Sequence, residues 1–239
     1  MRVASLATVV DRVHLLGDVV ESLLPQMDRI NVYLNGHTEL PDCLRKPDVW
    51  VAWSRGHGNL GDAGKFFWSG RLRDCYHFTC DDDLVYPPDY ATALIAAIER
   101  YERRAIVSVH GAVLHEPLKS YFRGRTAYPC LEELTEDHQV DVLGTGVLAY
   151  HTSTIHLSID DFPVANMADI WCAVAAKRRG VPRVVIAHER GWLRYLPPPE
   201  GTTIYDRYRA SGNDAAQTQI LASETPWTFC TRLDVVRER

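Results

Sequence analysis

The sequence predicts an α/β fold with a mostly parallel central sheet and helices on both faces. Short apolar runs rich in β-branched and aromatic residues alternate along the chain with segments whose apolar residues recur at helical spacing. This alternation is typical of strands joined by helical crossovers, which are parallel. The 239 residues are enough for one domain with a substantial core.

The first elements are expected as strand, helix and strand. Residues 3–8 form a β-prone run, and the apolar residues of segment 13–24 then recur at helical spacing up to Pro25. Residues 30–34 form the next apolar run, which the turn dipeptide Asn35-Gly36 ends.

The middle of the chain continues the pattern. A strand is expected at 49–53, a helix at 63–72, a strand at 76–80 and a helix at 89–103, where the apolar residues again recur at helical spacing.

Three more strands and a helix are expected before residue 190. The runs 105–109 and 147–150 are apolar and short, as is 183–187. The segment 167–179 is expected to be a helix, because Gly180 and a proline follow it.

Composition excludes several classes of protein. The net charge of −5 argues against a non-specific nucleic-acid binder. The six cysteines form no C-x-x-C pair, so neither a zinc ribbon nor a disulfide scaffold is expected. Asp11, Arg12 and Asp18 interrupt the apolar N-terminus, which leaves no secretory signal and no membrane span. These features predict a cytoplasmic protein.

Three carboxylates, Asp81, Asp82 and Asp83, follow the expected strand at 76–80. Their mutual repulsion is costly unless a cation or hydrogen-bond donors offset it, and Mg²⁺ or Mn²⁺ would do so while bridging to a substrate diphosphate. Ligands of open α/β sheets bind at the carboxyl ends of strands, which is where the triplet lies. The alternative is an ordinary turn in which an aspartate caps the helix after Pro88.

The segment from Phe78 to Pro87 resembles the Asp-x-Asp segment of glycosyltransferases with the GT-A fold, of the family 2-like type found in bacterial or viral polysaccharide synthesis. Segments 7–12, 20–26 and 32–36 are similar to the first strand, helix and second strand of such enzymes, and 61–66 resembles a donor-binding loop. The resemblance spans roughly residues 3–196. It implies a Rossmann-like sheet, a UDP-sugar donor, a saccharide or glycolipid acceptor, and Mn²⁺ or Mg²⁺ as cofactor.

The same resemblance implies roles for individual residues. Asp83, Asp81 and His188 are expected to hold the metal, with His188 completing the site from the late strand end. The residues expected to bind the donor are Ala7, Thr8, Arg12, Asn35, Asp62, Lys65, Asp81 and Asp82. Asp62 and Lys65 also have an ordinary interpretation, as a helix cap and a solvated helix residue.

Asp169 resembles the acidic residue at the head of the helix below the acceptor site in inverting members, and is the candidate general base. Its ordinary alternative is a first-turn carboxylate that favours the helix dipole. Asp160 and Asp161 are competitors. The residues expected on the acceptor side are Gly144, Thr145, Gly146 and Trp192.

The chain is expected to divide near residue 197. A catalytic domain is predicted at 1–196, with a nucleotide-sugar half at about 1–90 and an acceptor half at about 91–196. Residues 197–239 are expected to form a C-terminal extension or lid, because 200–213 is polar after a triple proline.

Two other functions remain open at this stage. A sugar-nucleotide nucleotidyltransferase would also place acidic residues around Mg²⁺, although segment 6–12 lacks the glycines of its phosphate-binding loop. A non-catalytic, metal-dependent carbohydrate-binding protein would use the same carboxylates without turnover.

Overall fold

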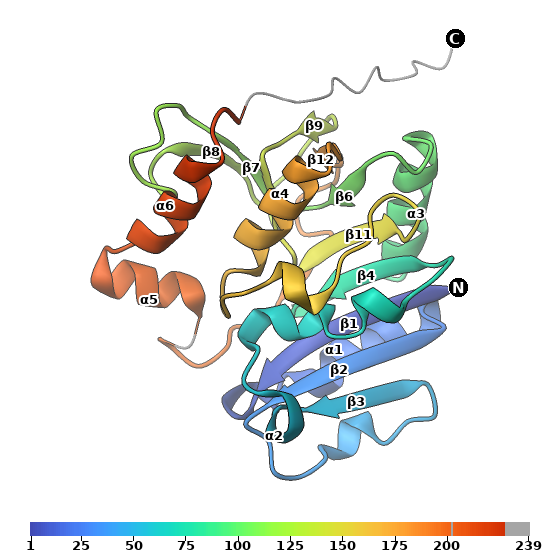
Figure 1. Cartoon of the computed structure of the whole chain (residues 1–239). Coiled ribbons are helices and arrows are strands. Elements are labelled where there is room, and N and C mark those ends of the chain that lie inside the picture. The colour runs from blue at the N-terminus through green and yellow to red at the C-terminus, as the bar shows by residue number, and fades with distance from the viewer. Residues whose placement is uncertain (202, 228–239) are drawn as a thin grey trace.

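The computed structural model describes residues 1–201 and 203–227 and is built on one eight-stranded sheet (Figure 1). The strands, from one edge to the other, are β3 (Val49–Trp53), β2 (Arg29–Asn35), β1 (Arg2–Val9), β4 (Tyr76–Cys80), β11 (Val147–His151), β6 (Ile106–Ser108), β12 (Arg183–Val185) and β9 (His138–Gln139). The predicted mixed α/β fold with a mostly parallel sheet is confirmed.

The sheet has a parallel half and a mixed half. β3, β2, β1 and β4 are all parallel, as are β6 and β12, whereas β11 runs antiparallel to both of its neighbours. A parallel return needs a crossover, usually a helix. Between β6 and β11 the chain forms instead an antiparallel sheet of β10 (Val142–Leu143), β7 (Gly111–Leu114) and β8 (Arg125–Tyr128).

Helices cover both faces of the large sheet, as predicted. α1 (Leu16–Leu23) and α3 (Tyr90–Arg100) pack on one face, and α4 (Ala168–Arg178) packs on the other (Figure 1). Each buries apolar side chains, such as Leu94 of α3 and Cys172 of α4, against the strands. Because such burial contributes about 25 cal/mol per Å², these two layers are the main source of stability.

The remaining elements are short. The two-stranded sheet pairs β5 (Leu84–Val85) with β13 (Arg194–Tyr195), and α2 (Ser54–His57) follows β3. The 3₁₀ turns are η1 (Val10–Arg12), η2 (Leu24–Gln26), η3 (Asp42–Leu44), η4 (Gly61–Phe66), η5 (Ser69–Arg71) and η6 (Ile159–Asp161).

The prediction of a helix at 63–72 is wrong, because this segment forms the 3₁₀ turns η4 and η5. Glycines at 61, 64 and 70 lower its helix propensity. Gly64 also lies so close to β2 that a Cβ there would approach the ring of Tyr33 to 2.7 Å. The segment therefore packs flat on β1 and β2.

The C-terminal segment contains two helices, α5 (Ile204–Ser211) and α6 (Ala215–Ser223), the second of which packs against α4 (Figure 1). Thr203 caps α5, since its hydroxyl accepts a 2.8 Å bond from the Asp206 N–H. Residues 202 and 228–239 of the predicted extension at 197–239 lie outside the described residues.

The structure also describes the helices and cysteines on which the sequence-based expectations depended. Within residues 1–201 and 203–227 there is no helix long and apolar enough to cross a membrane. The described cysteines at positions 43, 75, 80, 130 and 172 are free, and Cys230 lies outside the described residues.

Candidate functional site

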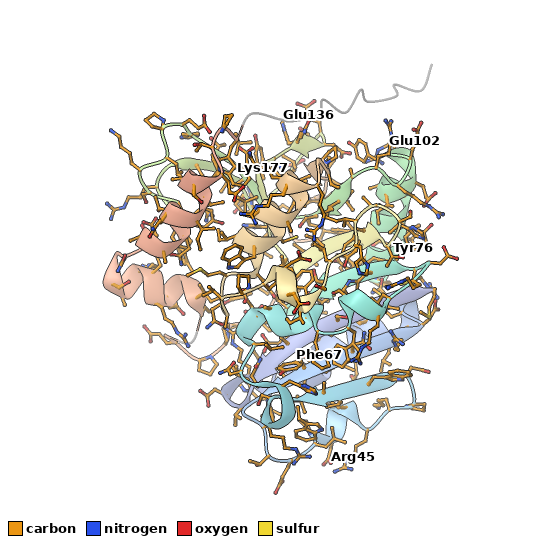
Figure 2. The ribbon with its side chains drawn as sticks, viewed as in Figure 1. Arg45, Phe67, Tyr76, Glu102, Glu136 and Lys177 are labelled. Carbon is orange, nitrogen blue, oxygen red and sulfur yellow. The ribbon has the colours of Figure 1, made fainter. Side chains whose placement is uncertain are left out.

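The acidic triplet lies in the turn between β4 and β5, at the carboxyl end of the central strand. Tyr76, labelled in Figure 2, lies at the opposite end of that strand. The Asp81 N–H donates to the Tyr86 hydroxyl at 2.7 Å, and that hydroxyl lies 2.7 Å from the Gly146 carbonyl oxygen, to which it donates. The turn is thus tied to the loop before β11 rather than used to cap α3.

Two cations hold the three carboxylates. Arg12 donates from Nη1 to Asp82 at 2.7 Å and lies 3.4 Å from an oxygen of Asp83, while Lys65 forms an ion pair with Asp81. Burial works against the charge of Lys65, but Asp81 and Asp62 more than offset this and raise its pKa above the usual value. Lys65 is therefore a fixed positive charge inside the site.

Asp83 is the least neutralised member of the triplet. Burial and then the charges of Asp81 and Asp82 raise the pKa of Asp83 to about 7, although Arg12 and Lys65 oppose the change. A carboxylate in this position gains from any further cation that enters the site.

The loop that carries Asp62 and Lys65 is positioned by Asn35. The Asn35 amide donates to the Gly61 carbonyl at 3.0 Å and accepts from the Leu60 N–H at 3.1 Å. Both ends of this side chain are used, so Asn35 positions the start of the loop that continues to Lys65. Gly61 adopts a φ of 56°, and a Cβ there would lie 2.4 Å from the Asn166 side chain.

Asp62 and Asp169 meet at the start of α4. Asp62 accepts a 3.0 Å bond from the Ala168 N–H through one oxygen, while its other oxygen is buried without a hydrogen-bond partner among the described residues. Burial raises the pKa of Asp62 to about 6. One oxygen of Asp169 accepts from both the N–H and the hydroxyl of Thr145, each at 2.7 Å.

The loop before β11 contacts two of the acidic side chains, Asp169 and Asp81. Thr145 orients Asp169, and the absence of a side chain at Gly146 makes room for Asp81, since a Cβ there would lie 1.8 Å from an Asp81 oxygen. Gly144 packs against His110, where a Cβ would come within 2.8 Å.

We expect the Gly146→Ala substitution to disable the site while leaving the fold intact. The added methyl would displace the Asp81 carboxylate and break its ion pair with Lys65. Loss of nucleotide binding by at least about tenfold is expected, because the buried ammonium of Lys65 would lose its ion-pair partner and the carboxylate would move out of the site. Calorimetry with UDP, beside circular dichroism as the folding control, measures this; unchanged affinity would contradict the role of Gly146.

A first cavity of about 250 Å³ opens above the ends of β1, β2 and β4. All eight residues expected to bind the donor line it, together with Asp83 and Asp169. The other lining residues are Val9, Gly61, Thr145, Asn166, Thr203, Ile204 and Arg207. Carboxylates outnumber cations in this lining, with five against three.

A second cavity of about 760 Å³ adjoins the first. Its walls come from β8, the loop after it, α4 and the C-terminal segment. The residues common to both linings are Asp62, Asp81, Asp83, Asn166, Asp169, Thr203 and Ile204. The two cavities therefore meet at the carboxylates.

His188 and Trp192 lie apart from both cavities. His188 is buried, its ring Nδ1 is 2.8 Å from the Ile186 carbonyl, and its backbone bridges to Leu134. The Trp192 indole N–H donates to Asp89 at 3.0 Å. A metal contact by His188 and an acceptor contact by Trp192 stay predictions.

The competing residues also have other partners. Asp161 completes the capping box of η6 and pairs with Arg179 at 2.6 Å. Arg190, which follows His188 by two residues, pairs with Glu132. None of these side chains except Glu132 lines either cavity.

Sequence patterns did not indicate Asn166 or Arg207 as site residues. Asn166 has a φ of 61°, and asparagine is one of the residues that tolerate this conformation, but no sequence signal marks it. Arg207 reaches the site from α5, whose start could have been found from the capping-box pattern Thr203-x-x-Asp206.

The fold and the position of the site define a Rossmann-like α/β domain, with its polar cavity at the carboxyl ends of parallel strands. No protein-family model and no curated protein sequence matches the chain.

Solved structures share the fold at low sequence identity. S. aureus TarS matches with a TM-score of 0.50 and 14% identity, over 93% of this chain and 42% of TarS. S. aureus TarS 1-349 matches with a TM-score of 0.50 and 12% identity, over 92% of this chain and 69% of that one. This chain thus spans less than half of the first of these two TarS chains.

A further structure, the inositol-1-phosphate CTP transferase from T. maritima, gives a TM-score of 0.47 at 12% identity, over 94% of this chain and 97% of that one. That likeness is too low to support an argument. The two matches with TarS support the fold alone.

Proposed function

We propose that the chain is a metal-dependent glycosyltransferase, which moves a sugar from a nucleoside diphosphate sugar, with UDP favoured, to a hydroxyl of a saccharide or glycolipid. The observation that carries this proposal is the meeting of two cavities at Asp62, Asp81, Asp83 and Asp169. Such an arrangement suits two substrates that react across a shared boundary.

In this proposal the smaller cavity holds the nucleotide part of the donor. Thr8 and Asn35 lie at its strand-end wall, and Arg12, Lys65 and Arg207 supply positive charge. Arg207 comes from α5, so the C-terminal segment would contribute directly to holding the diphosphate.

The residues present fit a divalent cation that is completed by substrate. Among the described residues, no three His, Cys, Asp or Glu side chains converge as a preformed metal site. Mg²⁺ and Mn²⁺, however, commonly take one or two carboxylates plus substrate phosphates, and Asp83 and Asp81 offer those carboxylates. A bound cation would neutralise the charge that develops on the leaving diphosphate.

Asp169 would take the proton of the acceptor hydroxyl. Thr145 holds one oxygen of Asp169 in a fixed position, and the side chain lines both cavities. A general base must lie within hydrogen-bond reach of the proton that it removes. A carboxylate at the boundary between the two cavities would meet this condition for an acceptor bound in the larger one.

The test is a screen of UDP- and other nucleotide sugars with Mn²⁺ by thermal shift, followed by assay of donor hydrolysis. We expect stabilisation by at least one UDP-sugar and slow release of UDP. A chain that binds donor without ever releasing UDP would be the carbohydrate-binding alternative. Formation of a nucleotide sugar from a nucleoside triphosphate and a sugar phosphate would establish the nucleotidyltransferase alternative.

Metal-dependent nucleotide binding should weaken as the pH falls. The folded pKa of Asp83, about 7, lies above its ordinary value of 3.8. In the apo chain this group therefore favours the folded state below about pH 4, and that contribution is lost as the pH rises to about 7. A cation prefers the ionised form, so the thermal stabilisation by Mn²⁺ plus UDP should grow between about pH 6 and 8. A pH-independent shift would contradict the role of Asp83.

A further inference from the structure

The larger cavity is built from segments that are distant in sequence. Tyr121, Phe122 and Arg125 enter it from the loop before β8 and from β8 itself, and Tyr205 enters it from α5. Figure 1 shows α5 and α6 beside the β7–β8 region. The cavity of about 760 Å³ lies within the size range of small-molecule sites and is larger than its neighbour.

An aromatic contact joins these two segments. The ring of Phe122 stacks on that of Tyr208, with centroids 4.0 Å apart and an interplanar angle of 25°. Asp214, just before α6, accepts from the Phe122 N–H at 2.9 Å and from the Ser120 hydroxyl at 2.6 Å. The aromatic wall is therefore held in place before any ligand arrives.

The charged side chains that line this cavity are mostly acidic, and Lys65, Arg12 and Arg190 pair with three of them, Asp81, Asp83 and Glu132, from outside the lining. Among the described residues in its lining, the carboxylates are Asp62, Asp81, Asp83, Glu132, Asp169 and Asp206. The lining has a single arginine or lysine, Arg125, whose guanidinium lies over the ring of Tyr121 at 4.2 Å and over that of Phe122 at 4.9 Å. This cation is already engaged by aromatic faces.

Asp62, which lines both cavities, also carries a buried acceptor atom. One Asp62 oxygen is buried and lacks a hydrogen-bond partner among the described residues. An unpaired buried acceptor is costly, and this cost is one reason why the pKa of Asp62 is raised.

We propose that this cavity binds the acceptor, and that the acceptor is a saccharide or glycoside without anionic groups. This inference rests on the proposed function. Aromatic side chains present an apolar face that packs against the C–H face of a sugar ring. This contact needs no charge on the ligand. Carboxylates around the cavity accept from neutral hydroxyl or positively charged amino groups, and they repel uronates and phosphates.

Direct binding measurements test the charge rule, which is the preference of this cavity for neutral and amino glycosides over anionic ones. They need no turnover. Neutral octyl hexosides, their aminodeoxy analogues, and the matching octyl uronides and hexoside 6-phosphates are titrated into the full chain and followed by ligand-observed NMR. We expect neutral and amino compounds to bind at least about tenfold more tightly than the anionic ones. Equal binding of a uronide or phosphate overturns the inference, as does a panel in which nothing binds.

Two variants locate the effect in this cavity. Tyr205→Ala removes an exposed aromatic side chain from the wall of this cavity and should weaken the binding of neutral glycosides by about tenfold while UDP affinity is kept. Glu132→Lys, at the half-exposed rim, should improve binding of the uronide by about threefold and reduce the preference for the neutral glycoside over the uronide. An unchanged uronide affinity in Glu132→Lys would also count against the charge rule.

Failure of this inference is separable from failure of the proposed function. Donor binding and UDP release depend on the smaller cavity and are measured without acceptor. If donor is hydrolysed but anionic glycosides bind as well as neutral ones, only the acceptor class is wrong. If no nucleotide sugar binds at all, the proposed function fails whatever the glycosides do.

Discussion

The Asp169→Asn variant is expected to bind UDP with Mn²⁺ as tightly as the parent chain and to lose glycosyl transfer by about 10²- to 10⁴-fold. The asparagine carbonyl can still accept the two 2.7 Å bonds from Thr145, so the loop before β11 should keep its structure. What the substitution removes is the basic oxygen at the boundary between the two cavities.

Asp160→Asn is the matched control for this experiment. Asp160 is a nearby carboxylate in η6 that lines neither cavity, so its transfer rate should stay within about twofold of the parent rate. The measurement is single-turnover transfer with saturating donor, with UDP affinity from calorimetry. Near-normal transfer by Asp169→Asn would place the base at another residue.

The parallel half of the fold was predictable because its central strands are buried. β2 contains the apolar run at 30–34, β4 coincides with the run at 76–80, and the segment 89–103 contains α3. Central parallel strands are apolar on both faces, so their sequences differ from those of the neighbouring loops. The strand ends, and with them the triplet at Asp81, follow from the same pattern.

The antiparallel part could not be predicted in the same way. β7, β8 and β10 are two to four residues long, and the segment that contains β8, from Lys119 to Tyr128, is polar. Strands this short owe their structure to tertiary contacts rather than to intrinsic preference. The aromatic wall of the larger cavity, with Tyr121 and Phe122, was missed for this reason.

The partners of the site residues depend on tertiary structure even where the residues themselves were expected. Arg12 and Asp82 are 70 positions apart, and Thr145 and Asp169 are 24 apart. Sequence indicated the chemistry of each side chain, but not that Arg12 would hold the triplet or that Thr145 would orient Asp169. Folding brings these partners together at one edge of the sheet.

The charge balance of the smaller cavity explains why a cation should be decisive for donor binding. Five carboxylates and three cations line it, and Arg12 and Lys65 are already paired with the acidic triplet. A diphosphate adds further negative charge, which this lining repels on balance. A divalent cation reverses that balance, and Asp83 is the carboxylate whose ionisation gains most from it.

Replacing Asp83 by asparagine should therefore have opposite effects with and without metal. With Mn²⁺ present, UDP affinity should fall by at least about tenfold, because a metal ligand has been lost. In EDTA, the same variant should bind UDP as well as the parent chain or slightly better, because one repulsive charge near the diphosphate is gone. Calorimetry of UDP binding under both conditions at about pH 8, where Asp83 of the parent is ionised, measures the crossover.

This crossover distinguishes a metal ligand from a residue that only supports the fold. A structural defect would weaken UDP binding in EDTA as well as in Mn²⁺, whereas a lost ligand would weaken it only in Mn²⁺. Glu132→Gln is the matched control, since Glu132 lines the larger cavity but not the smaller one and should leave both affinities unchanged. If Asp83→Asn keeps the full gain in affinity from Mn²⁺, Asp83 does not bind the metal. The cation would then have to be held by Asp81 and the substrate phosphates.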